Sequence, residues 1–368
     1  MLFRCKSTAF LHDLLLVQYK ASSAIALILI SSILFGFTLC ISLLPISAVI
    51  GYCLGVTLAS FFLRVGVGLF KSGAAISENI LPFTDKKIPA FDERNLSTLL
   101  GISANYAGKI IGFSADIISS FMIALTSCLL FSRVLLEKGL CDTISADKLM
   151  IIPIVTIAIS LVTTLIIFIL SPLKIKSKHK SNFLLEGLYL ALFSCGLTLY
   201  TLIRYLDVQV AFPSLWGTAQ HHAIFLPYLF GLIGAVLISF TSEYLTSNKY
   251  PPIKKLSSEI EFGSVLTTLN TFTLGLQSNS FYFIYILLMS IPSFYISGFY
   301  GIAMASLGML SVTPCILTLH IFSPISSTTE KLVKLSKSKQ GTLKTISKSE
   351  VIGQTTVAIG NGFASGAS

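Results

Sequence analysis

Three long stretches of this sequence carry no charged side chain. They run between Lys20 and Arg64, between Lys148 and Lys174, and between Glu261 and Glu330. Uncharged, mostly apolar stretches of about 18 residues or more are typical of helices that cross a bilayer. Only 11% of the residues are charged, whereas soluble domains carry about 25%. The sequence therefore predicts an all-α, polytopic transmembrane helix bundle and excludes an ordinary soluble enzyme.

The apolar segments predict eight complete membrane-spanning helices and a ninth that begins near residue 351. We expect the complete spans at residues 22–45, 46–70, 96–132, 149–171, 183–204, 222–245, 260–294 and 298–322. Pro45 favours a tight turn between the first two, because proline cannot continue a helix without losing a hydrogen bond. We expect these spans to form a single transmembrane domain over residues 1–368.

The basic residues predict the orientation of the chain in the membrane. With a cytoplasmic N-terminus, the inner segments hold 20 of the 26 Lys and Arg residues and the outer segments hold four. Cytoplasmic loops of membrane proteins collect such residues. We therefore expect a cytoplasmic N-terminus over residues 1–21 and cytoplasmic loops at 71–95 and 323–350. The net charge of +10 follows from this topology, so the expected partner is the lipid bilayer and not nucleic acid.

Two charged residues of opposite sign fall inside predicted spans. Arg64 lies late in the second span and Asp116 lies within the third. A charge inside the bilayer is costly and is kept when it has a partner or a function. We expect a buried ion pair between them. It could lock two helices together, or it could serve as a gate or ion relay. The seven cysteines form no CxxC pair, and we expect no metal site from them.

Several separated segments resemble one known family. The first covers GYCLG at Gly51–Gly55, RVGVGLF at Arg64–Phe70 and DERN at Asp92–Asn95. Later segments are SEYLT at Ser242–Thr246, YGIAMASLGML at Tyr300–Leu310, Ser323-Pro-Ile325 and GQTTVAIGNGFA at Gly353–Ala364. In this order they resemble the membrane-bound, ion-translocating pyrophosphatases. The resemblance implies a fold of sixteen helices, relative to which this chain is incomplete. It also implies Mg²⁺-dependent pyrophosphate hydrolysis coupled to H⁺ or Na⁺ transport, an ion gate that includes Arg64 and Asp116, and a homodimer. We expect a location in a bacterial inner membrane.

This chain departs from the family at most positions that would hold metal and substrate. Ser72 stands where the resemblance places a substrate lysine, and Ala75 and Asn79 stand for aspartates. The triplet D-x3-D-x3-D becomes Gly101, Asn105 and Lys109. Further replacements are His320, Ser327 and Ser347 for aspartates, Gln354 for an asparagine, Asn361 for a lysine and Ser119 for a gate glutamate. Asp85, Asp92 and Glu350 keep an acid at matched positions.

Three hypotheses about function follow. We favour a degenerate homologue that does not hydrolyse pyrophosphate, because the remaining acids are too few to hold a tetra-anionic substrate with its metals. The second hypothesis is an active pyrophosphate-energised pump with substituted ligands. The third is a non-enzymatic membrane transporter or interaction protein. No cofactor is expected under the favoured hypothesis, and Mg²⁺ is expected only if the chain is an active pump.

Overall fold

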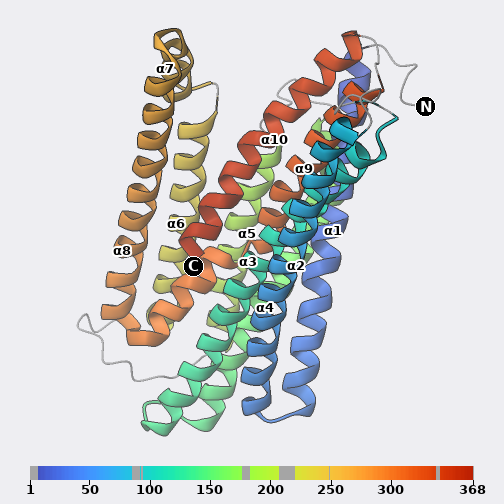
Figure 1. The fold of residues 1–368 in the computed structure, drawn as a ribbon. Coiled ribbons are helices and arrows are strands. Elements are labelled where there is room, and N and C mark those ends of the chain that lie inside the picture. Colours follow the sequence, from blue (N-terminus) through green and yellow to red (C-terminus); the bar gives the residue numbers. More distant parts are fainter. Residues whose placement is uncertain are drawn as a thin grey trace. The chain divides into compact units, whose positions relative to one another are not determined.

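The computed structural model describes residues 7–84, 92, 94–175, 183–206, 220–247, 249–336 and 340–367, and these residues form helices and short connections (Figure 1). The helices are α1 (Ser7–Leu43), α2 (Ile46–Thr84), α3 (Leu96–Glu137), α4 (Thr143–Ile175), α5 (Phe183–Leu206), α6 (Gln220–Thr246), α7 (Pro251–Glu259), the short 3-10 helix η1 (Ile260–Phe262), α8 (Ser264–Leu310), α9 (Thr313–Leu335) and α10 (Gln340–Ala367). The described chain contains no strand. The predicted all-α class is confirmed.

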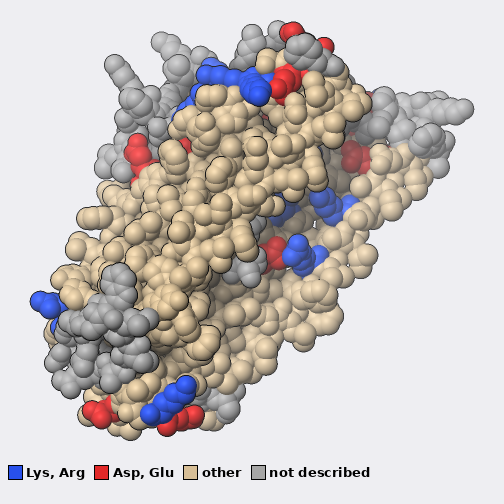
Figure 2. All heavy atoms as spheres, turned by 90° about the vertical axis from the view of Figure 1, so that its left-hand side faces the viewer, with Lys and Arg blue, Asp and Glu red and all other residues tan. Residues whose placement is uncertain are grey.

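Seven helical stretches among the described residues are long and apolar enough to cross a membrane. They are Asp13–Leu43, Ala48–Ile80, Leu96–Glu137, Thr143–Leu170, Leu185–Leu206, His222–Glu259 and Ser264–Leu310. This result confirms a multi-pass integral membrane protein. Most of the surface in Figure 2 is correspondingly free of charged side chains.

The last of these stretches contains most of the predicted span 260–294 and the first part of 298–322, because α8 bends sharply within its length. The predicted span 298–322 continues into α9, so a helix boundary falls inside it. Ser297 (φ −137°, ψ 16°) and Gly298 (φ 63°, ψ −146°) are not helical, and Figure 1 shows α8 reversing its direction. A Cβ on Gly301 would collide with the carbonyl oxygen of Ser293. In a straight helix those residues would be about 12 Å apart. The predicted boundary between 294 and 298 therefore coincides with this bend, which only a residue tolerant of positive φ accommodates readily.

Several helices extend well beyond the apolar segments that predicted them. α1 begins at Ser7 and not near residue 22, and α10 begins at Gln340 and not near 351. α2 continues to Thr84, so the expected loop at 71–95 begins with helix, and most of the expected loop at 323–350 lies in α9 and α10. At 1.5 Å per residue, helix α2 is about 58 Å long, against roughly 30 Å of hydrocarbon. Hydropathy marks the membrane core, whereas helical hydrogen bonding continues into the polar ends.

The helices are grouped into two compact units. Unit 1 contains residues Met1–Ser119, Ile166–Leu184 and Leu317–Val357, and unit 2 contains Ser120–Leu165, Leu185–Ile316 and Ala358–Ser368. α1 and α2 lie within unit 1, α6 to α8 lie within unit 2, and α3, α4, α5, α9 and α10 contribute residues to both. A single transmembrane domain stays a prediction. Of the site positions singled out in the sequence, only Asn361 lies outside unit 1.

Polar contacts join three helices of unit 1 near the N-terminal part of α1. The amide of Gln18 donates to Thr329 Oγ1 of α9 at 3.4 Å, and Ser349 Oγ of α10 donates to Gln18 Oε1 at 2.6 Å. One turn away, Leu14 and Ile346 form a small buried cluster. The cytoplasmic segments predicted at 1–21 and 323–350 therefore lie together at one end of unit 1. Their side of the membrane stays a prediction.

Candidate functional site

The α2 positions expected for a substrate lysine and two carboxylates hold small or neutral side chains. Ser72, Ala75 and Asn79 are exposed on the second half of the helix. Glu78 lies next to Asn79 in the sequence, and its carboxylate contacts α3 at Gly101, where it occupies the position that a Cβ would take. Gly101 is itself the first position of the altered triplet. The absence of a side chain there lets an acid from α2 approach the backbone of α3.

The three triplet positions lie on successive turns of α3 and share one face of that helix. Asn95 begins the helix as its N-cap, since its Oδ1 accepts from the backbone N–H of Ser97 at 2.9 Å and of Thr98 at 3.3 Å. Gly101, Asn105 and Lys109 follow. The three positions therefore share one face of α3, as the sequence predicts. That face carries the ammonium group of Lys109 and no carboxylate of its own.

Lys109 lies among other charged groups of unit 1. The charges that act on it are those of Lys331 on α9, Lys71 on α2 and Glu350 on α10. The stem of Lys71 crosses α3 beside it, because a Cβ on Gly108 would lie 3.4 Å from Cδ of Lys71. Sequence comparison with the family had singled out only Lys109 and Glu350 of these four. Lys71 precedes the matched position Ser72, and Lys331 lies four residues after the matched position Ser327. The packing of α2, α3 and α9 places both where their charges act on Lys109.

His320 replaces an aspartate and packs as an aromatic side chain. Its ring stacks on Phe113 of α3, with centroids 3.3 Å apart and planes 3° from parallel. His320 is buried, as is Phe113. The contact fixes the register of α9 against α3, one helical turn from Lys109. A structural role in packing accounts for this histidine without a ligand.

A pair of carboxyl groups links α9 to α10. Glu330, which is only 5% exposed, is hydrogen-bonded to Glu350. Its Oε1 also accepts from Ser347 Oγ at 2.9 Å and pairs with Lys334 Nζ at 2.9 Å. The hydrogen bond with Glu330 raises the pKa of Glu350, and the same bond with Glu350 lowers the pKa of Glu330. The titrations of the two carboxyl groups therefore depend on each other. Glu330 was missed in the sequence because it has no counterpart among the matched positions.

The other expected ligands either lie apart from Glu330 and Glu350 or already form hydrogen bonds or ion pairs with other groups. Asp92 forms a two-pronged ion pair with Arg94, at 2.9 Å to Nε and 3.1 Å to Nη2. Gln354 donates weakly to Glu350 at 3.4 Å, and Ser327 donates to the backbone of its own helix at 3.3 Å. Asn361 is exposed in unit 2. Asp85 lies outside the described residues.

The predicted pair between α2 and α3 is present. Arg64 Nη1 lies 2.5 Å from Asp116 Oδ1, which confirms the expected salt-bridge distance. The expectation that the pair is buried is wrong, because the two side chains are 62% and 38% exposed. One turn along the same face of α2, a Cβ on Gly68 would meet nothing within 4 Å. Ser119, at the position of a gate glutamate, donates to the backbone carbonyl of Asp116 and not to Arg64.

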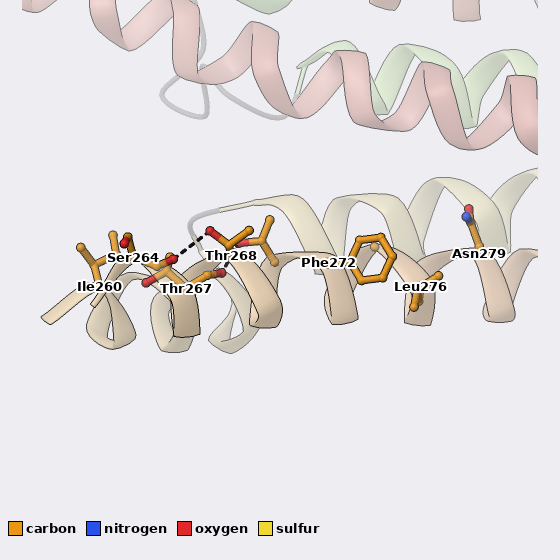
Figure 3. Close-up of a pocket in the computed structure, with 9 residues that line it drawn as sticks. Ile260, Ser264, Thr267, Thr268, Phe272, Leu276 and Asn279 are labelled. Atoms are coloured by element: carbon orange, nitrogen blue, oxygen red, sulfur yellow. Dashed lines mark hydrogen bonds between the residues drawn. The ribbon is translucent and has the colours of Figure 1, made fainter. Parts of the chain in front are cut away.

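A large groove lies elsewhere, in unit 2, and is lined by apolar and neutral polar side chains. It measures about 1020 Å³ and is lined along one face by η1 and α8 (Figure 3). Its threonine hydroxyls donate to carbonyls of their own helix, as Thr268 does to Ser264 at 2.8 Å. None of its nine lining residues is ionisable. It is therefore not a candidate for catalysis.

The donor set of unit 1 does not fit magnesium. Mg²⁺ requires near-octahedral oxygen ligands, usually with one or two carboxylates from the protein. Over the part of the chain that the structure describes, no three His, Cys, Asp or Glu side chains are grouped so that they could hold a metal ion. The triplet face presents an ammonium group, and Glu330 is already engaged by Ser347 and Lys334.

Comparison with known proteins gives a consistent family assignment. A family model described as inorganic H⁺ pyrophosphatase matches residues 4–368. The putative K⁺-stimulated pyrophosphate-energized sodium pump of Clostridium tetani is 25% identical over 326 residues, which are 86% of this chain and 45% of that protein. Pyrophosphate-energized membrane proton pump 3 of Arabidopsis thaliana is 24% identical over 341 residues, 86% of this chain and 41% of the relative.

A third relative shows the same partial coverage. The K⁺-stimulated pyrophosphate-energized sodium pump of Thermotoga maritima is 27% identical over 336 residues, 86% of this chain and 45% of the relative. The chain thus spans less than half the length of these relatives. The match nevertheless extends over nearly the whole chain, and it agrees with the order of the sequence segments and with the helical membrane fold. The chain belongs to the inorganic H⁺ pyrophosphatase family of membrane proteins.

Proposed function

We propose that this chain is a membrane protein of the family that does not hydrolyse pyrophosphate. The observation that carries the proposal is Lys109, which stands at the third position of the triplet with Lys71 and Lys331 acting on it. In the family, carboxylates at such positions hold Mg²⁺, which neutralises the phosphates and activates water. An ammonium group repels a divalent cation and offers it no lone pair.

An active pump would need carboxylates from other positions. Glu78, Glu330 and Glu350 are the acids near the altered positions. The hydrogen bond with Glu330 raises the pKa of Glu350, and Glu330 also pairs with Lys334. Recruiting Glu330 as a metal ligand would require it to leave Lys334 and Ser347. This competition favours the non-hydrolytic proposal over the hypothesis of substituted ligands.

The proposal is tested by phosphate release from pyrophosphate. The purified chain is assayed in mild detergent with and without Mg²⁺, beside the Thermotoga maritima relative as a positive control, and its folded state is checked by size-exclusion chromatography. We expect no Mg²⁺-dependent release from this chain. Mg²⁺-dependent release that is lost in both Glu330→Gln and Glu350→Gln would contradict the proposal and identify those acids as replacement ligands.

A further inference from the structure

Helices α5 and α6 of unit 2 form an apolar groove of about 480 Å³. It follows α5 from Tyr189 to Tyr200 and α6 from Phe225 to Val236. Each of these segments is about 16 Å long at 1.5 Å per residue, so the groove is elongated along the helices. Its lining residues all lie in membrane-spanning stretches, and none of them is charged. A volume of about 300–1,000 Å³ with a mostly apolar lining is typical of small-molecule sites, and here the ligand must be mainly hydrocarbon.

The groove is open along one side and has rigid walls. The lining side chains of Phe193 and Leu197 are 74% and 55% exposed, so a ligand can enter from the bilayer. At one end the rings of Tyr200 and Phe225 pack edge to face, with centroids 5.2 Å apart. A rigid ligand loses less conformational freedom on binding than a flexible acyl chain does. Fixed aromatic walls therefore favour a molecule with a rigid ring system.

The end of the groove at Tyr200 offers hydrogen-bonding groups. Arg204 lies near the C-terminal end of α5, and no charged side chain lies between it and Glu186 in the sequence. Such an arginine extends its guanidinium group toward the membrane surface. Tyr200 lies one turn before Arg204, on the same face of the helix. Its phenolic hydroxyl can donate or accept, and the guanidinium can donate. The ligand is therefore expected to carry an uncharged polar group at this end.

The sequence of α5 independently points to one class of such ligands. A short pattern proposed for contact with cholesterol has Leu or Val, then Tyr, then Lys or Arg, with one to five residues between them. Leu197, Tyr200 and Arg204 fit this pattern. The pattern is weak by itself, and it gains meaning only where the structure provides a site. Here both Leu197 and Tyr200 line the groove.

We propose that the groove between α5 and α6 binds a lipid of the sterol type. Its fused rings lie along the groove, and its hydroxyl group lies at the end marked by Tyr200 and Arg204. The inference is independent of the proposed function, because the groove belongs to unit 2 and nearly all the altered site positions belong to unit 1.

Photolabelling of the full chain in phosphatidylcholine vesicles tests the inference. The probe is cholestanol that carries a diazirine, and mass spectrometry identifies the labelled peptides. We expect saturable labelling of α5 and α6 that excess cholesterol suppresses. The epimer of cholesterol with the inverted hydroxyl group should compete poorly, because its hydroxyl points away from Tyr200 and Arg204. Tyr200→Phe keeps the ring and removes one hydrogen bond, so cholesterol should compete about fivefold more weakly in this variant.

A matched pair of variants tests the position of the ligand. Leu197→Trp places a larger side chain in the groove from an exposed position and should abolish the labelling. Leu190→Trp is the control, because Leu190 is 45% exposed on the same helix and does not line the groove. It should leave the labelling unchanged. Size-exclusion profiles establish that both variants are folded.

Three results would overturn the inference. They are labelling of Leu197→Trp equal to that of the parent chain, equal competition by cholesterol and its epimer, and equal competition by a diacylglycerol. The last result would show that the groove takes any hydrocarbon chain. None of these results bears on hydrolysis, which phosphate release measures separately.

Discussion

Replacing Gly308 with alanine should separate two helices of unit 2. Gly308 lies where the second limb of α8 crosses α6, and a Cβ there would collide with the carbonyl oxygen of Tyr228 and lie 3.1 Å from its carbonyl carbon. The contact is reciprocal, because a Cβ on Gly231 of α6 would collide with the carbonyl oxygen of Ala305. These partners are helix backbone, which cannot rotate away. Small residues that allow backbones to approach closely are typical of membrane helix interfaces.

The magnitude follows from two opposing effects. Overpacking of a tight interface costs about 1–3 kcal/mol, whereas alanine in place of a helical glycine gains roughly 0.5–1 kcal/mol. We expect Gly308→Ala to lower the free energy of unfolding by up to about 2 kcal/mol on these figures. Gly275→Ala is the matched control on the same helix, since a Cβ there would meet nothing within 4 Å. It should be neutral or slightly stabilising.

The two variants are compared by equilibrium unfolding in mixed micelles of sodium dodecyl sulfate and a mild detergent. The difference between them isolates the overpacking cost, because the helix-propensity gain is common to both. If Gly308→Ala unfolds at the same denaturant fraction as Gly275→Ala, the close approach of α6 and α8 is refuted.

Three further perturbations test unit 1. Asp116→Asn should lower the free energy of unfolding in detergent by less than about 1 kcal/mol, as for exposed ion pairs. The reason is that the side chains of Arg64 and Asp116 are 62% and 38% exposed. A loss near the roughly 3–5 kcal/mol of buried pairs would show that this pair is covered. The temperature of thermal unfolding, measured against pH, should be highest between the pKa values of Glu330 and Glu350. The pKa of Glu330 is lowered, so its contribution to stability is lost as the pH falls through that pKa. The pKa of Glu350 is raised, so its contribution to stability is lost as the pH rises through that pKa. Glu350→Gln should flatten the alkaline side of this profile, and an unchanged profile would refute the interaction between the two carboxyl groups. Gly353→Ala should destabilise the packing of α10 on α9, because a Cβ there would lie 3.1 Å from the Cα of Ser323. If the amides of α10 are as well protected from hydrogen exchange in this variant as in the parent chain, that packing is contradicted.

The apolar spans could be predicted because charges are excluded from hydrocarbon, so the uncharged stretches mark the membrane core. The ends of the helices could not be predicted from the same signal. Residues 7–21, which include the charged Asp13 and Lys20, continue α1, since helical hydrogen bonds form equally well outside the bilayer. The bend at Ser297 and Gly298 coincides with the predicted boundary between two spans, although the second of these, 298–322, is divided between α8 and α9.

The sequence predicts which individual positions of the candidate site have changed, but not which side chains lie together there. Comparison with the family motifs identified Lys109 as a replaced carboxylate, but it gave no reason to examine Lys71, Lys331 or Glu330. Their significance comes from side chains that meet only when α2, α3, α9 and α10 pack together. The Arg64–Asp116 pair was predicted because consecutive spans can face each other. Its exposure was not, because the sequence does not show which face of α2 is covered.

The central claim is that unit 1 presents a cation where the family motif carries a carboxylate, and divalent-ion binding tests this most directly. Mn²⁺, a paramagnetic substitute for Mg²⁺, is titrated into the purified full chain without pyrophosphate and followed by electron paramagnetic resonance, beside Lys109→Asp. The account predicts no saturable Mn²⁺ binding to the parent chain. Stoichiometric binding to the parent that is lost in Glu330→Gln or Glu350→Gln would contradict it.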